Sequence, residues 1–250
     1  MGLSREQVVR RLVVALDTSD EEAIVALAHR LAGHVGMLKV GLEAFTAAGP
    51  RVVARVREVG LPVFLDLKLH DIPNTVERAA ANCARSGVTL FNVHAAGGPD
   101  MVRAAATGAA AGTPAGGQRP GLLAVTVLTS LDEPTLELLG MPGTAQQRVL
   151  DWAAMSRQAG ADGVVCSPRE LTALRQRLGP VFILLAPGIR PLSSAAGDQK
   201  RIATPAAALA DGADFFVVGR PITAAADPVA AAAAIVDEVL ASSPRKGSAG

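Results

Sequence analysis

Four titratable side chains stand within six residues in the segment DLKLHDIPNT (66–75), directly after the apolar run LPVFL (61–65). The apolar run is typical of a buried strand, and side chains along a strand alternate between its two faces. Asp66 and Lys68 should therefore share one face, about 6 to 7 Å apart. Charges that enter a buried interior need a reason, because an unpaired buried charge is costly. A carboxylate and an ammonium held there could stabilise developing charge or move a proton.

A second lysine has the same setting. Lys39 lies between two apolar residues in the run GMLKVG (36–41), so its side chain should point to the same interior as those of Asp66 and Lys68. A structural salt bridge that fills the interior is the alternative, but buried ion pairs add little to stability because lost hydration offsets their attraction. We therefore favour a functional cluster formed by Lys39, Asp66 and Lys68.

Other polar residues also stand where apolar runs end. Asp17 ends the first run, Thr129 follows the fifth, and Gly219 and Arg220 end the eighth. The segment VVGRPI around Arg220 resembles a phosphate site, because a glycine allows close backbone approach and an arginine can donate two hydrogen bonds to a phosphate. Asp71 lies beyond its strand, just before a proline suited to the first turn of a helix, so capping that helix is its alternative role.

The elements that must position these residues alternate along the chain. Apolar runs rich in Val, Leu, Ile and Phe are separated by helical patterns, such as residues 19–33, where Ser19 or Asp20 is a candidate N-cap. Eight such units in 250 residues predict an α/β fold, a single (β/α)8 TIM barrel over residues 1–241 with its active site at the C-terminal ends of the strands, rather than a doubly wound sheet. Residues 242–250 read as a disordered tail. The runs are 12–17, 36–41, 63–68, 89–95, 122–128, 163–167, 182–189 and 214–220.

Composition excludes several classes of partner. The 24 lysines and arginines balance 23 aspartates and glutamates, which gives no general attraction to nucleic acid or to an anionic membrane. Cys83 and Cys166 lie far apart, without the spacing of a zinc site or a disulfide scaffold, and we expect a reduced, cytoplasmic protein. The N-terminus has no signal-peptide core, and charges interrupt the alanine-rich stretch 224–241, so no membrane segment is expected. The single histidine of NVHAAGG, His94, is interpreted as part of the core rather than as a catalytic group.

Eight short motifs resemble those of the orotidine 5'-phosphate decarboxylase family along nearly the whole chain. The DxKxxD signature of that family matches residues 66–71. This signature alone also occurs in related sugar-phosphate decarboxylases and aldolases of the same barrel superfamily, but the set of motifs is far more specific. The others are VALD (14–17), LKVGLE (38–43), NVHAAGG (92–98), VTVLTS (125–130), APGIRP (186–191), GDQKR (197–201) and VVGRPIT (217–223).

The resemblance implies a reaction and an assembly. The reaction is the decarboxylation of orotidine 5'-monophosphate to uridine 5'-monophosphate, the last step of de novo pyrimidine nucleotide synthesis, without a cofactor or a metal. The assembly is a homodimer in which each site holds an alternating Lys-Asp-Lys-Asp array. By similarity the array consists of Lys39, Asp66 and Lys68 of one chain and Asp71 of its partner.

The resemblance also implies which residues bind the substrate. Asp17 and Lys39 would contact the ribose hydroxyls, Thr129 would bind the pyrimidine, and Thr75 would reach across the dimer interface beside Asp71. A further group would grip the phosphate while the segment 188–204 closes over the ligand. This group consists of Arg190, Gln199, Gly219 and Arg220.

Two other functions compete with this interpretation. One is a metal-dependent phosphosugar lyase of the same superfamily, in which acidic residues at strand ends hold magnesium. Lys39 beside Asp66 argues against it, because an ammonium competes for the place of the cation. The other is a catalytically silent phosphate-binding or scaffold protein built on a barrel, against which the intact set of charged residues argues.

Overall fold

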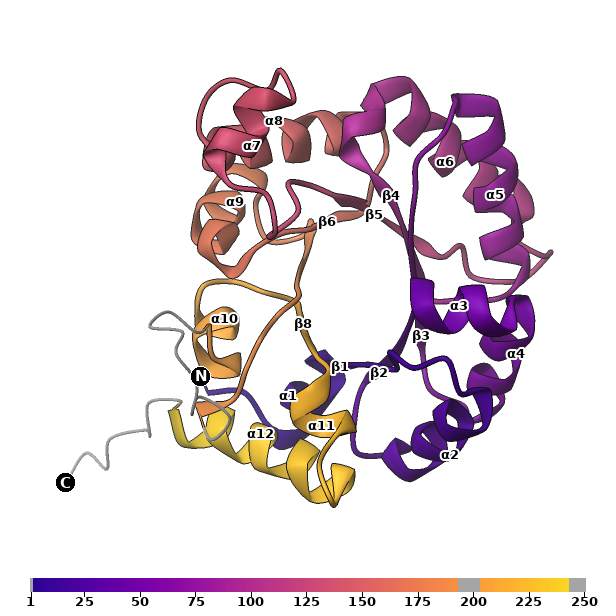
Figure 1. Ribbon diagram of the computed structural model, residues 1–250, viewed down its shortest axis with the longest axis vertical. Coiled ribbons are helices and arrows are strands. Elements are labelled where there is room, and N and C mark those ends of the chain that lie inside the picture. Colours follow the sequence, from indigo (N-terminus) through magenta and orange to yellow (C-terminus); the bar gives the residue numbers. More distant parts are fainter. Residues whose placement is uncertain (1, 193–202, 243–250) are drawn as a thin grey trace.

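The computed structural model describes residues 2–192 and 203–242, in which eight parallel strands close into a barrel in the order of the sequence (Figure 1). Each strand overlaps one of the eight apolar runs, so the predicted (β/α)8 barrel is confirmed. The strands are β1 (Leu12–Ala15), β2 (Met37–Gly41), β3 (Val63–Leu69), β4 (Leu90–His94), β5 (Gly121–Val125), β6 (Gly163–Val165), β7 (Ile183–Ala186) and β8 (Phe215–Val218).

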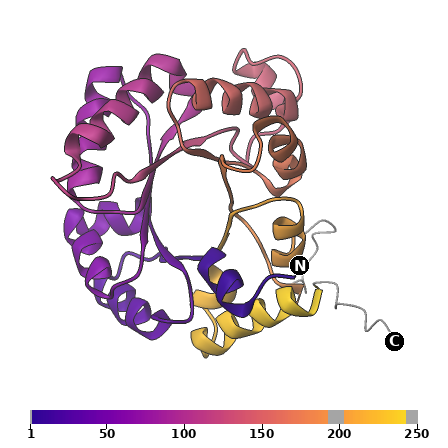
Figure 2. The ribbon, with the colours of Figure 1, turned by 180° about the vertical axis from the view of Figure 1, so that it is seen from behind.

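Helices surround the barrel, and α1 lies at the N-terminal ends of the strands, as Figure 2 shows from behind. Figure 1 therefore looks onto the C-terminal ends. In the described ranges no helix has the length and apolar character needed to cross a membrane. The helix α12 includes Ser242, the first residue of the expected tail; the remainder, 243–250, lies outside the described residues. The helices are α1 (Arg5–Arg11), α2 (Glu21–Leu31), α3 (Leu42–Ala48), α4 (Pro50–Glu58), α5 (Pro73–Arg85), α6 (Gly98–Gly112), α7 (Glu133–Leu138), α8 (Ala145–Gln158), α9 (Leu171–Leu178), α10 (Pro205–Ala210), α11 (Arg220–Thr223) and α12 (Pro228–Ser242), with short 3-10 turns η1 (Ala95–Gly97) and η2 (Pro168–Glu170).

Alternation along the strands divides the core into two parts. One part fills the barrel interior and includes Met37 and Phe64, while the other lies between strands and helices and includes Leu38 and Leu65. Burying each large apolar side chain contributes about 1.5–3 kcal/mol, so this alternation fixes the face of every strand. A polar residue two positions after an inward apolar residue lies on the same face of its strand, so its side chain points into the barrel mouth.

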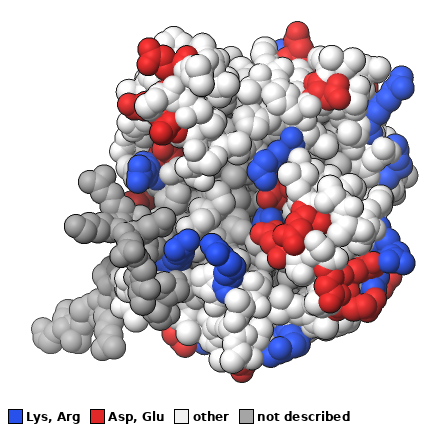
Figure 3. Space-filling view, in the orientation of Figure 1, with Lys and Arg blue, Asp and Glu red and all other residues white. Residues whose placement is uncertain are grey.

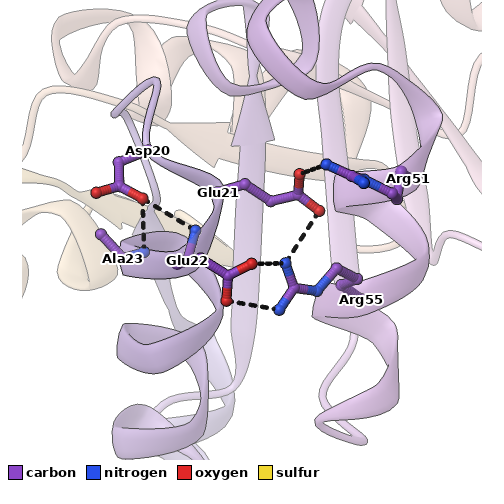
Figure 4. Close-up of polar contacts among 6 residues, drawn as sticks. All are labelled: Asp20, Glu21, Glu22, Ala23, Arg51 and Arg55. Atoms are coloured by element: carbon purple, nitrogen blue, oxygen red, sulfur yellow. Dashed lines mark hydrogen bonds and ion pairs between the residues drawn. The ribbon is translucent and has the colours of Figure 1, made fainter.

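Helix α2 is fixed at its start and along its side (Figure 4). Of the two candidate caps, Asp20 is the N-cap, because its Oδ1 accepts hydrogen bonds from backbone N–H groups of the first turn at 3.0 and 3.1 Å. Arg55 of α4 pairs with both Glu22, at 2.5 Å, and Glu21, at 3.2 Å, and Arg51 also pairs with Glu21. These ion pairs hold together two of the helices that cover β1 and β2.

Two glycines bring α5 and α6 into close contact. A Cβ atom at Gly108 would lie 2.0 Å from the Glu77 carbonyl oxygen, and one at Gly112 would lie 2.2 Å from that of Ala81. No other residue fits at such distances without moving a helix. Because α5 starts at Pro73, the segment that bears Asp71 runs directly into this tightly packed pair.

Candidate active site

Four of the charged side chains predicted at the barrel mouth form one continuous cluster, namely Asp17, Lys39, Asp66 and Lys68. Asp66 lies between two ammonium groups, with its Oδ2 3.2 Å from Lys39 Nζ and its Oδ1 2.7 Å from Lys68 Nζ. Lys39 Nζ also contacts Asp17 Oδ1 at 2.9 Å. The side chains of Lys39 and Asp66 are 10% and 13% exposed, whereas that of Lys68 is 32% exposed. The side chain of Lys68 is therefore the more accessible of the two lysines.

The electrostatic surroundings keep Asp66 ionised. Burial acts to raise the pKa of Asp66, but the charges of Lys39 and Lys68, with hydrogen bonds from Lys68 and Asn92, outweigh it and hold that pKa below its ordinary value. A negative charge is thus fixed between two positive ones at neutral pH. Figure 3 shows acidic and basic side chains gathered around the central hollow of this face.

Lys68 has an unusual backbone conformation. Its φ is 53°, and among the described residues no other non-glycine residue has a positive φ. The pairing of β3 with β4 shifts register between Leu65 and Leu69, so Lys68 lies in an irregular stretch of β3 rather than in a regular ladder. A left-handed conformation costs a non-glycine residue about 1–3 kcal/mol, and such strained residues cluster at functional sites.

Asn92 is a member of the cluster that sequence reasoning missed. It lies in β4 and is 1% exposed; its Oδ1 accepts a hydrogen bond from Lys68 N–H at 2.7 Å, and its Nδ2 donates one to Asp66 Oδ1 at 2.7 Å. A signal was present in the sequence, because Asn92 stands two residues after Leu90, which faces the barrel interior. Alternation therefore directs the amide toward Asp66.

Two adjoining cavities open above the cluster and share the side chains of Lys39, Asp66 and Lys68. The first, of about 220 Å³, is mainly apolar and has Thr129 at its edge. The second, of about 420 Å³, has a polar lining. The apolar walls of the first suit a flat ring, and the arginines of the second suit an anionic group. The apolar walls of the first are Phe64, Val125, Val165, Leu185 and Val217, and the second is lined by Asp17, Arg190, Gly219 and Arg220.

Comparison with known proteins identifies the family. Residues 10–235 match the model of the Orotidine 5'-phosphate decarboxylase / HUMPS family. The chain belongs to this family. It is 52% identical over 235 residues to the orotidine 5'-phosphate decarboxylase of Moorella thermoacetica, covering 92% of each chain. It is 53% identical over 231 residues to that of Halorhodospira halophila, covering 92% of this chain and 96% of the other.

A solved structure agrees with the fold and the family. The crystal structure of orotidine 5'-phosphate decarboxylase from Lactobacillus acidophilus superposes with a TM-score of 0.82 at 43% identity. The superposition covers 92% of this chain and 99% of the other. The similarity therefore extends over the complete barrel of a decarboxylase of this family.

Three of the four residues that the family resemblance assigns to the phosphate, Arg190, Gly219 and Arg220, line the same cavity at the mouth. Arg190 is half-buried, and Arg220 is exposed at the start of α11. At Gly219 an added Cβ would meet only the Cβ of Ala15, at 3.8 Å, so the backbone there is open to a ligand. Gln199, together with residues 193–202 of the expected closing segment 188–204, lies outside the described residues.

Asp71 and Thr75 do not take part in the cavities of their own chain. Both are exposed, and neither lines the two cavities above the cluster. The helix-capping alternative for Asp71 is wrong, because α5 has Ile72 as its N-cap, with no side-chain capping bond. Asp71 Oδ1 instead accepts a hydrogen bond from Ile72 N–H at 2.6 Å, and both residues precede the first residue of the helix.

His94 stands beside the cluster in an aromatic group at the rim. Its Nδ1 accepts a hydrogen bond from Ala96 N–H at 3.2 Å, its ring stacks on His70 at 5.5 Å, and Trp152 meets its ring edge-on at 6.1 Å. Burial lowers the pKa of His94, and the charges of His70 and Lys68 lower it further. A neutral, hydrogen-bonded imidazole agrees with the structural interpretation of this histidine.

The position that a metal ion would need is occupied by Lys39. Its Nζ lies between the carboxylates of Asp17 and Asp66, at 2.9 and 3.2 Å. Within residues 2–192 and 203–242, no three or more His, Cys, Asp or Glu side chains are grouped so that they could hold a metal. The donor set at the mouth therefore does not fit the metal-dependent lyase.

Proposed function

We propose that this chain decarboxylates orotidine 5'-monophosphate to uridine 5'-monophosphate in pyrimidine biosynthesis and that the cluster of Lys39, Asp66 and Lys68 performs the reaction. The observation that carries the proposal is Asp66 held between two ammonium groups beside an apolar cavity, in a chain of the decarboxylase family. An apolar cavity can take the pyrimidine and place its reacting carbon against the charges.

The reaction needs a fixed positive charge. When the bond between carbon 6 and the carboxylate breaks, the electron pair stays on carbon 6 in an sp² orbital that does not delocalise into the ring. A preorganised cation near that carbon stabilises the developing carbanion. Lys68 lines both cavities, and its side chain is more exposed than that of Lys39, so we assign this role to it. Lys68 then donates a proton to carbon 6, and the resulting amine takes a proton from solvent.

Asp66 acts on the group that leaves. A substrate carboxylate about 4 Å from an ionised aspartate experiences a repulsion of about 4 kcal/mol at an effective dielectric constant of about 20. This repulsion disappears as carbon dioxide departs. The lowered pKa of Asp66 supports the proposal, because the group must be charged to act in this way. Asp66 also holds both lysines in place through its two oxygens.

A homodimer would complete each site. Asp71 and Thr75 are exposed, and so are two apolar side chains that follow the adjacent strands β3 and β2, Ile72 (66%) and Leu42 (52%). Large apolar side chains exposed in this way favour burial against another protein surface. In a two-fold interface Asp71 would enter the cluster of the partner, and the partner would supply its own in return.

The remaining residues would bind the parts of the substrate that do not react. Asp17 and Lys39 would hold the ribose hydroxyls, and Thr129 would hydrogen-bond the pyrimidine. Energy from binding the distant phosphate can then hold the reacting end against repulsion. The phosphate group of residues is Arg190, Gly219 and Arg220, with Gln199 from the closing segment 188–204.

We also propose where and with what the enzyme works. A near balance of charge, 24 basic against 23 acidic residues, favours no nucleic acid or membrane partner. Both cysteines, Cys83 and Cys166, are unpaired and buried, which agrees with the reducing cytoplasm. One barrel domain over residues 1–241 would contain every residue assigned here.

An absorbance assay tests the function. Loss of the absorbance of orotidine 5'-monophosphate should be observed with the purified protein, and a metal chelator should leave the rate unchanged. Turnover that stops with the chelator and returns with magnesium would favour the metal-dependent lyase. A protein that binds the nucleotide without turnover would be the silent barrel instead.

A further inference from the structure

We propose that Asn92 is a positioning residue that sets the direction of the Lys68 ammonium toward the reacting carbon. The inference rests on the function proposed above and assigns that function a further residue. It follows from the hydrogen bonds that one amide makes to two members of the cluster, at 2.7 Å each.

The irregularity of β3 creates the need for such a residue. Between its paired positions Leu65 and Leu69 the strand advances four residues, while β4 advances only two, from Phe91 to Val93. Two additional residues of β3 must therefore be accommodated, and Lys68 takes a left-handed conformation there. The side chain of Asn92 provides an acceptor for Lys68 N–H within this irregular stretch. The amide of Asn92 thus stabilises the irregular backbone of β3 at Lys68, which the backbone hydrogen bonds between β3 and β4 do not fix.

The same amide fixes the orientation of the Asp66 carboxylate. Asp66 Oδ1 accepts hydrogen bonds from both Lys68 Nζ and Asn92 Nδ2, and its Oδ2 faces Lys39 Nζ. Loss of the Asn92 donor would leave the carboxylate freer to rotate, and Lys68 would move with it. Asn92 therefore positions both ends of Lys68. It binds the backbone N–H of Lys68 directly, and it orients the Asp66 carboxylate that binds the Lys68 ammonium.

Asparagine is the side chain that satisfies both partners. Lys68 N–H can only donate and an ionised Asp66 can only accept, so the amide must present its oxygen to Lys68 and its nitrogen to Asp66. Asn92 is 1% exposed, so water does not readily replace either bond. It lines neither of the two cavities above the cluster, which separates its role from substrate binding.

The decisive experiment compares kcat and KM of Asn92→Ala with those of the parent protein. A misplacement of about 1 Å costs roughly a hundredfold in rate, so we expect kcat to fall by about that factor while KM stays within about threefold. Exchange of the carbon 6 proton of uridine 5'-monophosphate with deuterated solvent also passes through Lys68. We expect this exchange to slow by a similar factor.

A matched control removes another buried hydrogen bond at the same rim. Thr126 is fully buried, and its Oγ1 donates to the Val165 carbonyl at 2.9 Å rather than to a charged side chain of the cluster. Thr126→Val should lower the unfolding temperature without the loss of kcat. If both variants lose kcat alike, Asn92 supports only the rim in general, and the positioning role is wrong.

A second variant guards against a failure of Asn92→Ala to fold. Asn92→Leu keeps the volume of the side chain but removes both the acceptor for Lys68 N–H and the donor to Asp66, and we expect kcat to fall by at least about tenfold. A folded Asn92 variant with parent values of kcat and of proton exchange overturns this inference alone. A parent protein without turnover of orotidine 5'-monophosphate overturns the proposed function and this inference together.

Discussion

Replacing Lys68 with methionine removes the ammonium and keeps most of the length of the side chain. A positive charge about 4 Å from the developing carbanion is worth about 4 kcal/mol at an effective dielectric constant of about 20, and each ~1.36 kcal/mol changes a rate tenfold. Loss of the charge therefore costs about a thousandfold. Loss of the proton donor costs roughly another 10² to 10⁴. We expect Lys68→Met to slow decarboxylation by at least about 10⁵.

The same substitution should leave the fold intact. Asp66 keeps Lys39 at 3.2 Å and Asn92 at 2.7 Å, so its carboxylate is not left unpaired. A hydrogen bond to a charged group is worth about 1.5–3 kcal/mol, and the 32% exposure of the Lys68 side chain places the loss at the lower end. The unfolding temperature should fall by about 2–4 °C per kcal/mol lost, which is measurable by calorimetry.

The assay is a single turnover with enzyme in excess, followed by absorbance, together with calorimetric titration of uridine 5'-monophosphate. The product has no carboxylate, so its affinity for Lys68→Met should stay near that of the parent. A single-turnover rate within tenfold of the parent rate would remove Lys68 from the chemistry. A loss of product affinity as large as the loss of rate would show that Lys68 binds the nucleotide rather than the transition state.

Three further predictions concern the phosphate, the dimer and pH. Arg220→Ala should raise KM and lower kcat for the nucleotide, whereas kcat/KM for a nucleoside substrate without phosphate should stay unchanged. An equal loss of kcat/KM for both substrates would assign Arg220 another role. Mixing inactive Lys68→Ala and Asp71→Ala chains should restore about a quarter of the parent activity per site, because half of randomly formed dimers contain one intact site; verified heterodimers without activity would place Asp71 in its own subunit. The pKa of His94 is lowered by burial and by the charges of His70 and Lys68, so near and below about pH 6.5 the unfolded chain binds more protons than the folded chain, and stability should fall as the pH falls below about 6.5. His94→Asn, which keeps an acceptor for Ala96 N–H, should reduce that fall in unfolding temperature, and an unchanged fall would assign it to other groups.

The inward direction of Lys39 and Asp66 was predictable because strand alternation has a fixed period of two. Each stands two positions after an inward apolar residue, Met37 and Phe64, so packing of the barrel interior decides its face. The same reasoning explains why all eight strands could be found from apolar runs. Their exact ends could not, since β5 stops at Val125, several residues before its apolar run does.

The conformation of Lys68 was not predictable from local sequence. Glycine and asparagine are the residues that usually adopt a left-handed backbone conformation, and the stretch LKLH contains neither. The conformation is a consequence of the mismatch between β3 and β4, which is a property of two segments about 25 residues apart rather than of one. Asn92 had a signal in its alternation with Leu90, but a single polar residue in the run LFNVH does not reveal what it binds.

The two glycines that join α5 to α6 have a consequence for how two chains would associate. The backbones of α5 and α6 are so close that a Cβ added at either glycine would lie 2.0 or 2.2 Å from a carbonyl oxygen of α5, and we expect the two helices to move as one rigid unit. Asp71 and Thr75 lie at the N-terminal end of this unit. Groups already held in their docking arrangement have little conformational entropy to lose when a partner arrives. A larger side chain at Gly108 or Gly112 would weaken the contact between α5 and α6 and so the association of two chains. The first sign would be activity that depends on protein concentration.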